Sequence, residues 1–150
     1  MDVVTEPTQA DRHQGVRVLW ADDDPMIRTV MATNLEAEGF DVQTVADGDA
    51  AYEAAVLLRP DVLVLDIMMP GRDGYAVLRA LRSNPTTAEV PVVLLSAKAT
   101  DAEVWEGWKA GADYYITKPF NPTELTGFIE HLLLRPEPDD APSRPIGAGS

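Results

Sequence analysis

The chain has 150 residues, a mass of 16.3 kDa and 45% apolar residues, so it is long enough for one domain with one hydrophobic core. Its formal net charge of −13, from 25 acidic and 12 basic residues, predicts no direct nucleic-acid binding, because phosphate backbones are bound by clustered Lys and Arg. The sequence contains no cysteine, which excludes disulfides, zinc–thiolate sites and a thiol nucleophile.

The two ends of the sequence differ in composition from its centre. Residues 1–15 are polar and lack periodicity, which predicts a flexible N-terminal arm. Residues 135–150 are rich in Pro, Gly, Ser and Asp and predict a disordered tail or the stub of a linker. One domain is therefore expected over residues 16–134. No signal peptide and no apolar run of membrane-spanning length is found, so a cytoplasmic protein without membrane contact is expected.

Strand and helix patterns alternate between these ends. Predicted strands at 16–21, 41–45, 62–66, 90–96 and 114–117 alternate with helices within 25–39, 47–60, 73–85, 100–111 and 121–134. Three of the strands are nearly continuous apolar runs rich in β-branched residues, as buried parallel strands require. The strand at 114–117 is shorter and more polar, which places it at an edge. Five β/α units of this kind predict an α/β fold, a doubly wound (βα)5 sandwich with a five-stranded parallel sheet.

Polar side chains follow the predicted strands where ligands bind in such folds, at the carboxyl ends. Asp22 and Asp23 follow the first strand and Asp66 ends the third, whereas Ser96 and Lys118 stand at the ends of the fourth and fifth. Crowded carboxylates repel one another unless a cation lies between them. Three such groups form a hard, oxygen-rich site that suits Mg²⁺ (or Mn²⁺).

The same residues are suited to phosphoryl transfer. Asp66 leads into a Gly- and Pro-containing turn, which favours an accessible side chain, so it is the candidate nucleophile. Lys118 is positioned to pair with one phosphoryl oxygen and Ser96 to donate a hydrogen bond to another. Such transfer requires mainly positioning and neutralisation of charge.

Four motifs in order resemble the response-regulator receiver domain of bacterial two-component signalling, which has a flavodoxin-like, CheY-like fold: DDDPMIR, DVLVLDIMMPGRDG, LLSA and GADYYITKPF. The resemblance covers about residues 16–134. It implies that Asp66 is the phosphoacceptor and that the metal is held by Asp22, Asp23, Asp66 and the backbone carbonyl of Met68.

The resemblance also implies roles for residues of the later strands. Ser96 and Lys118 match the phosphoryl-binding pair, and Ser96 and Tyr115 match the residues that switch. A cis peptide bond is implied before Pro119. Met68 and Lys98 occupy positions that tune dephosphorylation in this family.

Several residues also have an ordinary structural interpretation. Asp24 is expected to be solvated and to help cap the helix that begins at Pro25, rather than to bind metal. Strand alternation sends Tyr114 and Tyr115 to opposite faces, and the spacing from Lys118 favours Tyr115 as the switch residue. Trp105 and Trp108 share one helical face and are expected to pack inward, with a partner surface as the alternative.

Three functions compete. The preferred one is a receiver that accepts a phosphoryl group on Asp66 from a sensor histidine kinase or a histidine phosphotransfer protein and catalyses only its own phosphorylation and dephosphorylation. A phosphohydrolase of the haloacid-dehalogenase type is disfavoured, because that class carries an acid where this chain has Met68. A phosphorylation-independent pseudo-receiver is disfavoured because the key acids and the lysine are all present.

The resemblance also leads to expectations about output. The family implies that the surface of the fourth helix, fifth strand and fifth helix contacts a downstream protein. A stand-alone receiver, monomeric or weakly dimeric on phosphorylation, is favoured, because Tyr114 replaces the second acid of a transcription-factor subfamily motif. The alternative is the N-terminal receiver fragment of a larger regulator.

Overall fold

The computed structural model describes residues 15–97 and 100–134. The expectations for the arm, for Lys98 and for the tail at 135–150 therefore fall outside the described residues. Among the helices that are described, none is both long and apolar enough to cross a membrane.

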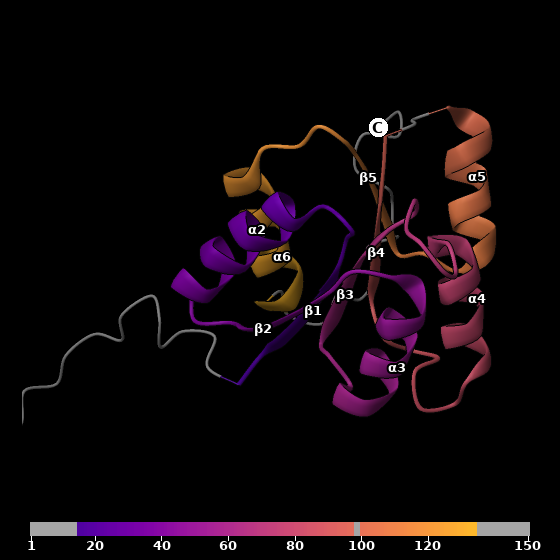
Figure 1. Ribbon diagram of the computed structural model, residues 1–150, viewed down its shortest axis with the longest axis horizontal. Helices are drawn as coiled ribbons and strands as arrows, with labels where there is room; N and C mark the ends of the chain where they lie inside the picture. The colour runs from indigo at the N-terminus through magenta and orange to yellow at the C-terminus, as the bar shows by residue number, and fades with distance from the viewer. Residues whose placement is uncertain (1–14, 98–99, 135–150) are drawn as a thin grey trace, which may run out of the picture.

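Five parallel strands form a single sheet in the order β2-β1-β3-β4-β5, so β5 lies at an edge as predicted. Helices cover both faces of the sheet, with α2 and α6 on one side and α3, α4 and α5 on the other (Figure 1). The doubly wound (βα)5 architecture predicted from the sequence is thereby confirmed. The elements are β1 Arg17–Ala21, α2 Pro25–Ala37, β2 Asp41–Val45, α3 Gly48–Leu58, β3 Val62–Asp66, α4 Gly74–Ser83, β4 Val92–Ser96, α5 Asp101–Ala110, β5 Tyr114–Thr117 and α6 Pro122–Leu134.

The hydrophobic core is divided by the sheet into two clusters. Alternate residues of each central strand enter opposite clusters, because successive side chains of a strand point to opposite faces. In β3, for example, Leu63 and Leu65 face α3, α4 and α5, whereas Val62 and Val64 face α2 and α6. Burial of both faces explains why β1, β3 and β4 read as continuous apolar runs.

Each helix begins at a side chain that accepts hydrogen bonds from its first backbone N–H groups. Those residues are Asp24, Asp47, Asp73, Thr100 and Asn121. Such caps satisfy donors that have no partner within the helix. The Asp24 carboxylate accepts from Met26 N at 2.9 Å, so the structure gives it the capping role expected from the sequence.

The start of β4 differs from the prediction. The strand begins at Val92, two residues later than expected, because the backbone of Val90 bonds elsewhere. The Val90 N–H donates to the carbonyl of Thr87, and its own carbonyl accepts from Arg82. Val90 therefore belongs to the turn that precedes the strand.

The expectation that Trp105 and Trp108 pack inward is wrong. Trp105 is 63% exposed and Trp108 is half-buried, whereas Gly107 and Ala110 form the buried side of α5. A Cβ atom on Gly107 would lie 3.0 Å from both Leu94 and Tyr115, so the helix approaches the sheet closely at this point. That approach turns the two indoles away from the core.

Candidate phosphorylation site

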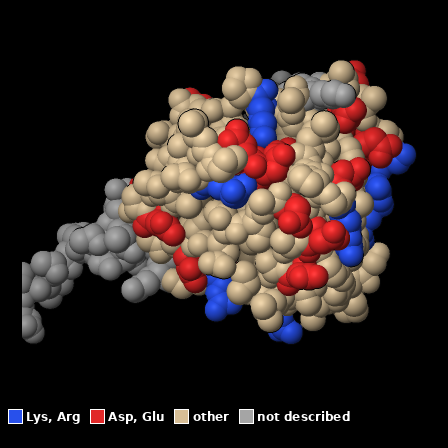
Figure 2. All heavy atoms as spheres, in the orientation of Figure 1, with Lys and Arg blue, Asp and Glu red and all other residues tan. Residues whose placement is uncertain are grey.

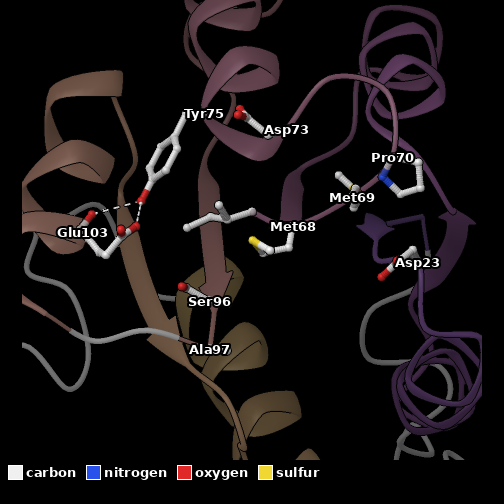
Figure 3. Close-up of a pocket in the computed structure, with 10 residues that line it drawn as sticks. Asp23, Met68, Met69, Pro70, Asp73, Tyr75, Ser96, Ala97 and Glu103 are labelled. Atoms are coloured by element: carbon white, nitrogen blue, oxygen red, sulfur yellow. Dashed lines mark hydrogen bonds between the residues drawn. The ribbon is translucent and has the colours of Figure 1, made fainter.

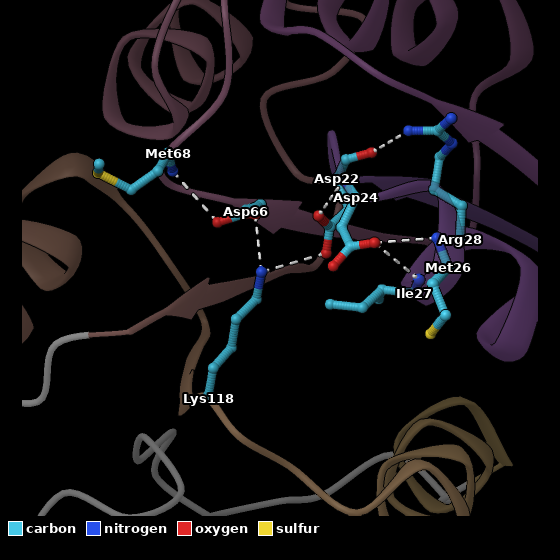
Figure 4. A network of polar contacts seen from close by, with 8 residues as sticks. All are labelled: Asp22, Asp24, Met26, Ile27, Arg28, Asp66, Met68 and Lys118. Carbon is cyan, nitrogen blue, oxygen red and sulfur yellow. Dashed lines mark hydrogen bonds and ion pairs between the residues drawn. The ribbon is translucent and has the colours of Figure 1, made fainter.

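The polar residues predicted at the strand ends come together at the carboxyl edge of the sheet, and Figure 4 shows Asp22, Asp66 and Lys118 among them. Asp22 and Asp23 follow β1, and Asp66 ends β3, which is paired with β1 on one side and β4 on the other. Lys118 follows β5, and its backbone N–H donates to the carbonyl of Ser96 at 2.7 Å. The parallel register therefore brings residues up to 96 positions apart into one site.

Three carboxylates crowd this edge. Asp22, Asp23 and Asp66 each offer an oxygen, and these oxygens lie within 4.8 Å of one another. Asp22 is fully buried and Asp66 is 4% exposed, whereas Asp23 is exposed and gives access from solvent. In the space-filling view, acidic side chains gather near the centre of this face with basic groups beside them (Figure 2).

The Lys118 ammonium group bridges the two buried carboxylates. Its Nζ lies 2.8 Å from Asp66 Oδ2 and 3.3 Å from Asp22 Oδ2. One ammonium group against three carboxylates leaves formal negative charge at the site. The site is therefore complementary to a further cation.

Backbone groups hold the two buried carboxylates in place. Asp66 Oδ1 accepts from Met68 N at 3.1 Å, and Asp22 Oδ1 accepts from Asp24 N at 3.0 Å. The Arg28 guanidinium donates to the backbone carbonyl of Asp22 at 2.8 Å. The role of Arg28 could not be predicted from the sequence, because its contact depends on the turn between β1 and α2.

Burial raises the pKa of the Asp66 carboxyl above its ordinary value. The hydrogen bond and charge of Lys118 oppose this rise, and the neighbouring Asp22 charge adds to it. Burial by itself would lower the pKa of Lys118, but its contacts with Asp66 and Asp22 outweigh burial and raise that pKa. Lys118 is therefore charged at neutral pH, whereas ionisation of Asp66 costs free energy in the folded chain.

The donor set fits a small hard divalent cation. Mg²⁺ takes oxygen ligands from one or a few carboxylates and keeps several water molecules, so it needs an accessible acidic site rather than a closed cage. The exposed Asp23 beside buried Asp22 and Asp66 provides such a site. The residues that could hold the ion are thus those singled out in the sequence.

The remaining predicted residues lie around this centre. Ser96 is 3% exposed at the end of β4, and Tyr115 is 3% exposed within the core cluster beneath α5. The Tyr115 side chain is thus in an inward position. The Lys118–Pro119 peptide bond is cis. The Met68 side chain is 66% exposed, two residues after Asp66.

A cavity of about 640 Å³ opens beside the carboxylates, between the loop after β3 and helix α5 (Figure 3). Asp23, Met68 and Ser96 line it. Its far wall carries Tyr75, whose hydroxyl donates to Glu103 Oε1 at 2.9 Å and links α4 to α5. The sequence contained no signal for this pair, because its members lie 28 residues apart on different helices.

Two relatives are similar to this chain over about half of their own length. The chain is 41% identical over 119 residues to the DNA-binding dual master transcriptional regulator RpaA of Synechocystis sp., covering 79% of this chain and 49% of that protein. It is 40% identical over 131 residues to the DNA-binding response regulator MtrA of Mycolicibacterium smegmatis, covering 87% and 56%. The chain spans about half the length of these relatives.

These relatives contradict the prediction of no nucleic-acid binding, since both are DNA-binding regulators. The prediction was wrong because a net charge of −13 describes only these 150 residues. It carries no information about the remaining part of these longer relatives.

Solved structures agree with the fold. The receiver domain of Francisella response regulator 1452 superposes with a TM-score of 0.75 at 36% identity, covering 82% of this chain and all of that one. The receiver domain of the Pseudomonas aeruginosa sensor histidine kinase PA1611, with a magnesium ion coordinated in its active-site cleft, has a TM-score of 0.72 at 31% identity, covering 79% and 98%. The family model of the response regulator receiver domain matches residues 18–130, most of the described core. With its fold, its carboxylate edge and these matches, the chain belongs to the response-regulator receiver family.

Proposed function

We propose that Asp66 accepts a phosphoryl group from a phosphohistidine of a sensor histidine kinase or a histidine phosphotransfer protein. The observation that carries this proposal is the contact of Asp66 with Lys118 at 2.8 Å, within a group of three carboxylates at an accessible edge. A carboxylate oxygen of Asp66 attacks phosphorus, an O–P bond forms, and the P–N bond to the donor imidazole breaks. The imidazole leaves with a proton taken from solvent.

The neighbouring residues have separate tasks in this reaction. Lys118 moves its ammonium group from the Asp66 carboxylate to a phosphoryl oxygen, and the Ser96 hydroxyl donates to another. Bound Mg²⁺, held by Asp22, Asp23, Asp66 and the Met68 carbonyl, would neutralise charge on the phosphoryl oxygens. Hydrolysis later returns Asp66 to its carboxylate, as water attacks phosphorus and the O–P bond to Asp66 breaks. The receiver thus catalyses only its own modification.

The output is a change of population between two conformations. Phosphorylation adds roughly 1.5 to 2 negative charges, by analogy with phosphoserine, at the carboxyl edge of the sheet where Ser96 ends β4. Ser96 moves toward the phosphoryl group and strengthens the inward position of Tyr115, which alters the surface of α5, β5 and α6. An almost complete change of state requires roughly 5.5 kcal/mol of differential stabilisation.

The names of the longer relatives bear on what this surface controls. RpaA and MtrA are DNA-binding regulators, which favours a receiver that works in a longer DNA-binding protein over a stand-alone receiver. A mobility-shift assay on the protein isolated from its own cells, with and without phosphorylation, tests this part. A phosphorylation-dependent shift is expected, and none in either state favours the stand-alone alternative.

Intact-mass spectrometry after incubation with acetyl phosphate and Mg²⁺ tests the acceptor. The unmodified sequence is expected to gain one phosphoryl group, and Asp66→Asn and EDTA are each expected to abolish the gain. A gain that persists in Asp66→Asn would place the acceptor elsewhere. If no phosphoryl group is added by acetyl phosphate or by a phosphorylated histidine kinase, the chain is a pseudo-receiver.

A further inference from the structure

The loop between β3 and α4 lies against the first turn of α3. This loop contains Met68, whose backbone carbonyl is assigned to the metal site under the proposed function. The Gly48 N–H donates to the Pro70 carbonyl at 3.1 Å, so the two segments are joined through their backbones. Arg72 Nε lies 3.0 Å from Asp49 Oδ1, which joins them through side chains as well.

The approach of these segments leaves no space for larger residues. A Cβ atom on Gly48 would overlap the carbonyl oxygen of Arg72. Gly71 has a φ of +77°, in the left-handed region that favours glycine, and a Cβ there would lie 3.0 Å from Asp49 Oδ2. The loop backbone is therefore packed directly on the start of α3.

The Arg72 guanidinium makes a second contact with α3. Its Cζ lies 4.9 Å from the centroid of the Tyr52 ring, a cation–π distance. The Tyr52 hydroxyl in turn accepts from the Asn84 amide at 3.0 Å, at the end of α4. Asp49 and Tyr52 lie three residues apart on the same helical face, so one arginine engages both.

The other end of the loop is attached to β3, the strand that ends at Asp66. Met68 N donates to Asp66 Oδ1, and Gly74 N donates to the carbonyl of Ile67 at 2.9 Å. Ile67 is also buried, at 5% exposure. With one end fixed by β3 and the other by α3, the loop has little freedom to move its central carbonyl groups.

We propose that Asp49, Arg72 and Tyr52 form a clamp that positions the loop after β3 for binding a divalent cation. These are positioning residues, because their contacts join α3 to the loop and they act on the ion through the loop backbone. The proposal rests on the proposed function in assuming that Asp22, Asp23, Asp66 and the backbone carbonyl of Met68 bind a divalent cation. Its distinct content is that an exposed ion pair between the loop and α3 determines part of the cation affinity.

An effect of charge alone predicts the opposite change in cation affinity when Arg72 is replaced. If Arg72 acted only through space, removing its positive charge would strengthen cation binding, whereas removing the negative charge of Asp49 would weaken it. A clamp requires both members, so loss of either one weakens binding. The sign of the Arg72 effect therefore separates the two explanations.

The experiment is an NMR titration of ¹⁵N-labelled protein with MgCl₂, which gives the dissociation constant from amide shifts and shows whether each variant is folded. Arg72→Gln and Asp49→Asn are each expected to raise the dissociation constant about threefold, the scale of one exposed ion pair. The double variant is expected to show no more than the larger single effect, because the second substitution removes a contact already lost. Glu106→Gln, which breaks the exposed pair with Lys109 on α5, is the control and should leave the constant unchanged.

Three results would overturn the clamp. Tighter Mg²⁺ binding by Arg72→Gln would show an effect of charge alone, and unchanged binding by both variants would show that the loop is positioned without the pair. If the unmodified sequence shows no Mg²⁺-dependent shifts at all, the cation site itself is wrong and the clamp falls with it. Phosphorylation by acetyl phosphate then tests the proposed function separately. If the unmodified sequence is phosphorylated and binds Mg²⁺, but both variants bind Mg²⁺ unchanged, only the clamp is wrong.

Discussion

Two charged clusters lie at opposite ends of the sheet, and they are built differently. At the carboxyl end, Asp22, Asp23 and Asp66 are met by one ammonium group, that of Lys118. At the amino ends of β4 and β5, Arg82 pairs with Asp113 at 3.0 Å. The first cluster has formally two more negative than positive charges, whereas the second is balanced.

The balanced cluster uses all three nitrogen atoms of the Arg82 guanidinium group. Besides Asp113, Arg82 donates to the carbonyl groups of Gly111, Ala88 and Val90, at 3.0, 3.1 and 2.7 Å. Asp113 also accepts from Val92 N, at the start of β4. These contacts join α4 to the loop that follows it and to the start of β5. This cluster therefore has a structural role. The excess charge at the opposite end indicates a site for ligands instead.

The largest effect on stability is expected from the balanced cluster. Arg82→Met leaves several carbonyl groups and Asp113 without their donor, and is expected to lower the free energy of unfolding by about 2–3 kcal/mol. Urea denaturation measures this change, and Lys109→Met, at an exposed ion pair, is the control expected to change stability by less than about 0.5 kcal/mol. A variant as stable as the unmodified chain would show that the contacts of Arg82 contribute no net stability. Mg²⁺ affinity should be unchanged in Arg82→Met.

A smaller effect, of opposite sign, is expected from the site with excess negative charge. Mg²⁺ binds the folded chain and should stabilise it by about 1.4 kcal/mol at ten times its dissociation constant. The change is read from urea curves with and without MgCl₂ at constant ionic strength. Asp66→Asn should lose most of this gain and Arg82→Met should keep it. Equal stabilisation of both variants would mean that Mg²⁺ acts on the surface charge as a whole.

The smallest effect concerns the cost of ionising Asp66 without metal. Its pKa is raised in the folded state by burial, so the folded chain binds this proton more tightly than the unfolded chain. This group's contribution to stability therefore falls as pH rises from about pH 4 through the raised pKa, and is lowest above it. Asp66→Asn should consequently be more stable than the unmodified chain at neutral pH, with a smaller difference below pH 4. Urea midpoints at both pH values without Mg²⁺ measure this, and a pH-independent difference would show that ionisation is not its cause.

Much of the site could be predicted from the sequence because strand ends in a parallel sheet share one edge. The buried strands read as apolar runs, so their ends at Asp22, Asp66 and Ser96 could be located before any tertiary contact was known. Capping by Asp24 was predictable for the same reason, since the N-cap preference depends only on neighbouring residues.

Tertiary structure decided the features that depend on how helices approach the sheet and one another. Trp105 and Trp108 have the spacing of a buried stripe, but the close contact of Gly107 with Leu94 and Tyr115 determines which side of α5 is covered. The pairing of Arg72 with Asp49 likewise arises where a loop packs against another helix.

The sequence by itself determined the alternation of strands and helices and the residue types at the strand ends, because these follow from local periodicity and capping. Only the tertiary structure decided that one lysine bridges Asp22 and Asp66 and that α3 fixes the loop beside them. Such contacts join residues distant in the chain through the strand register and the packing of a loop on a helix, which no local pattern encodes.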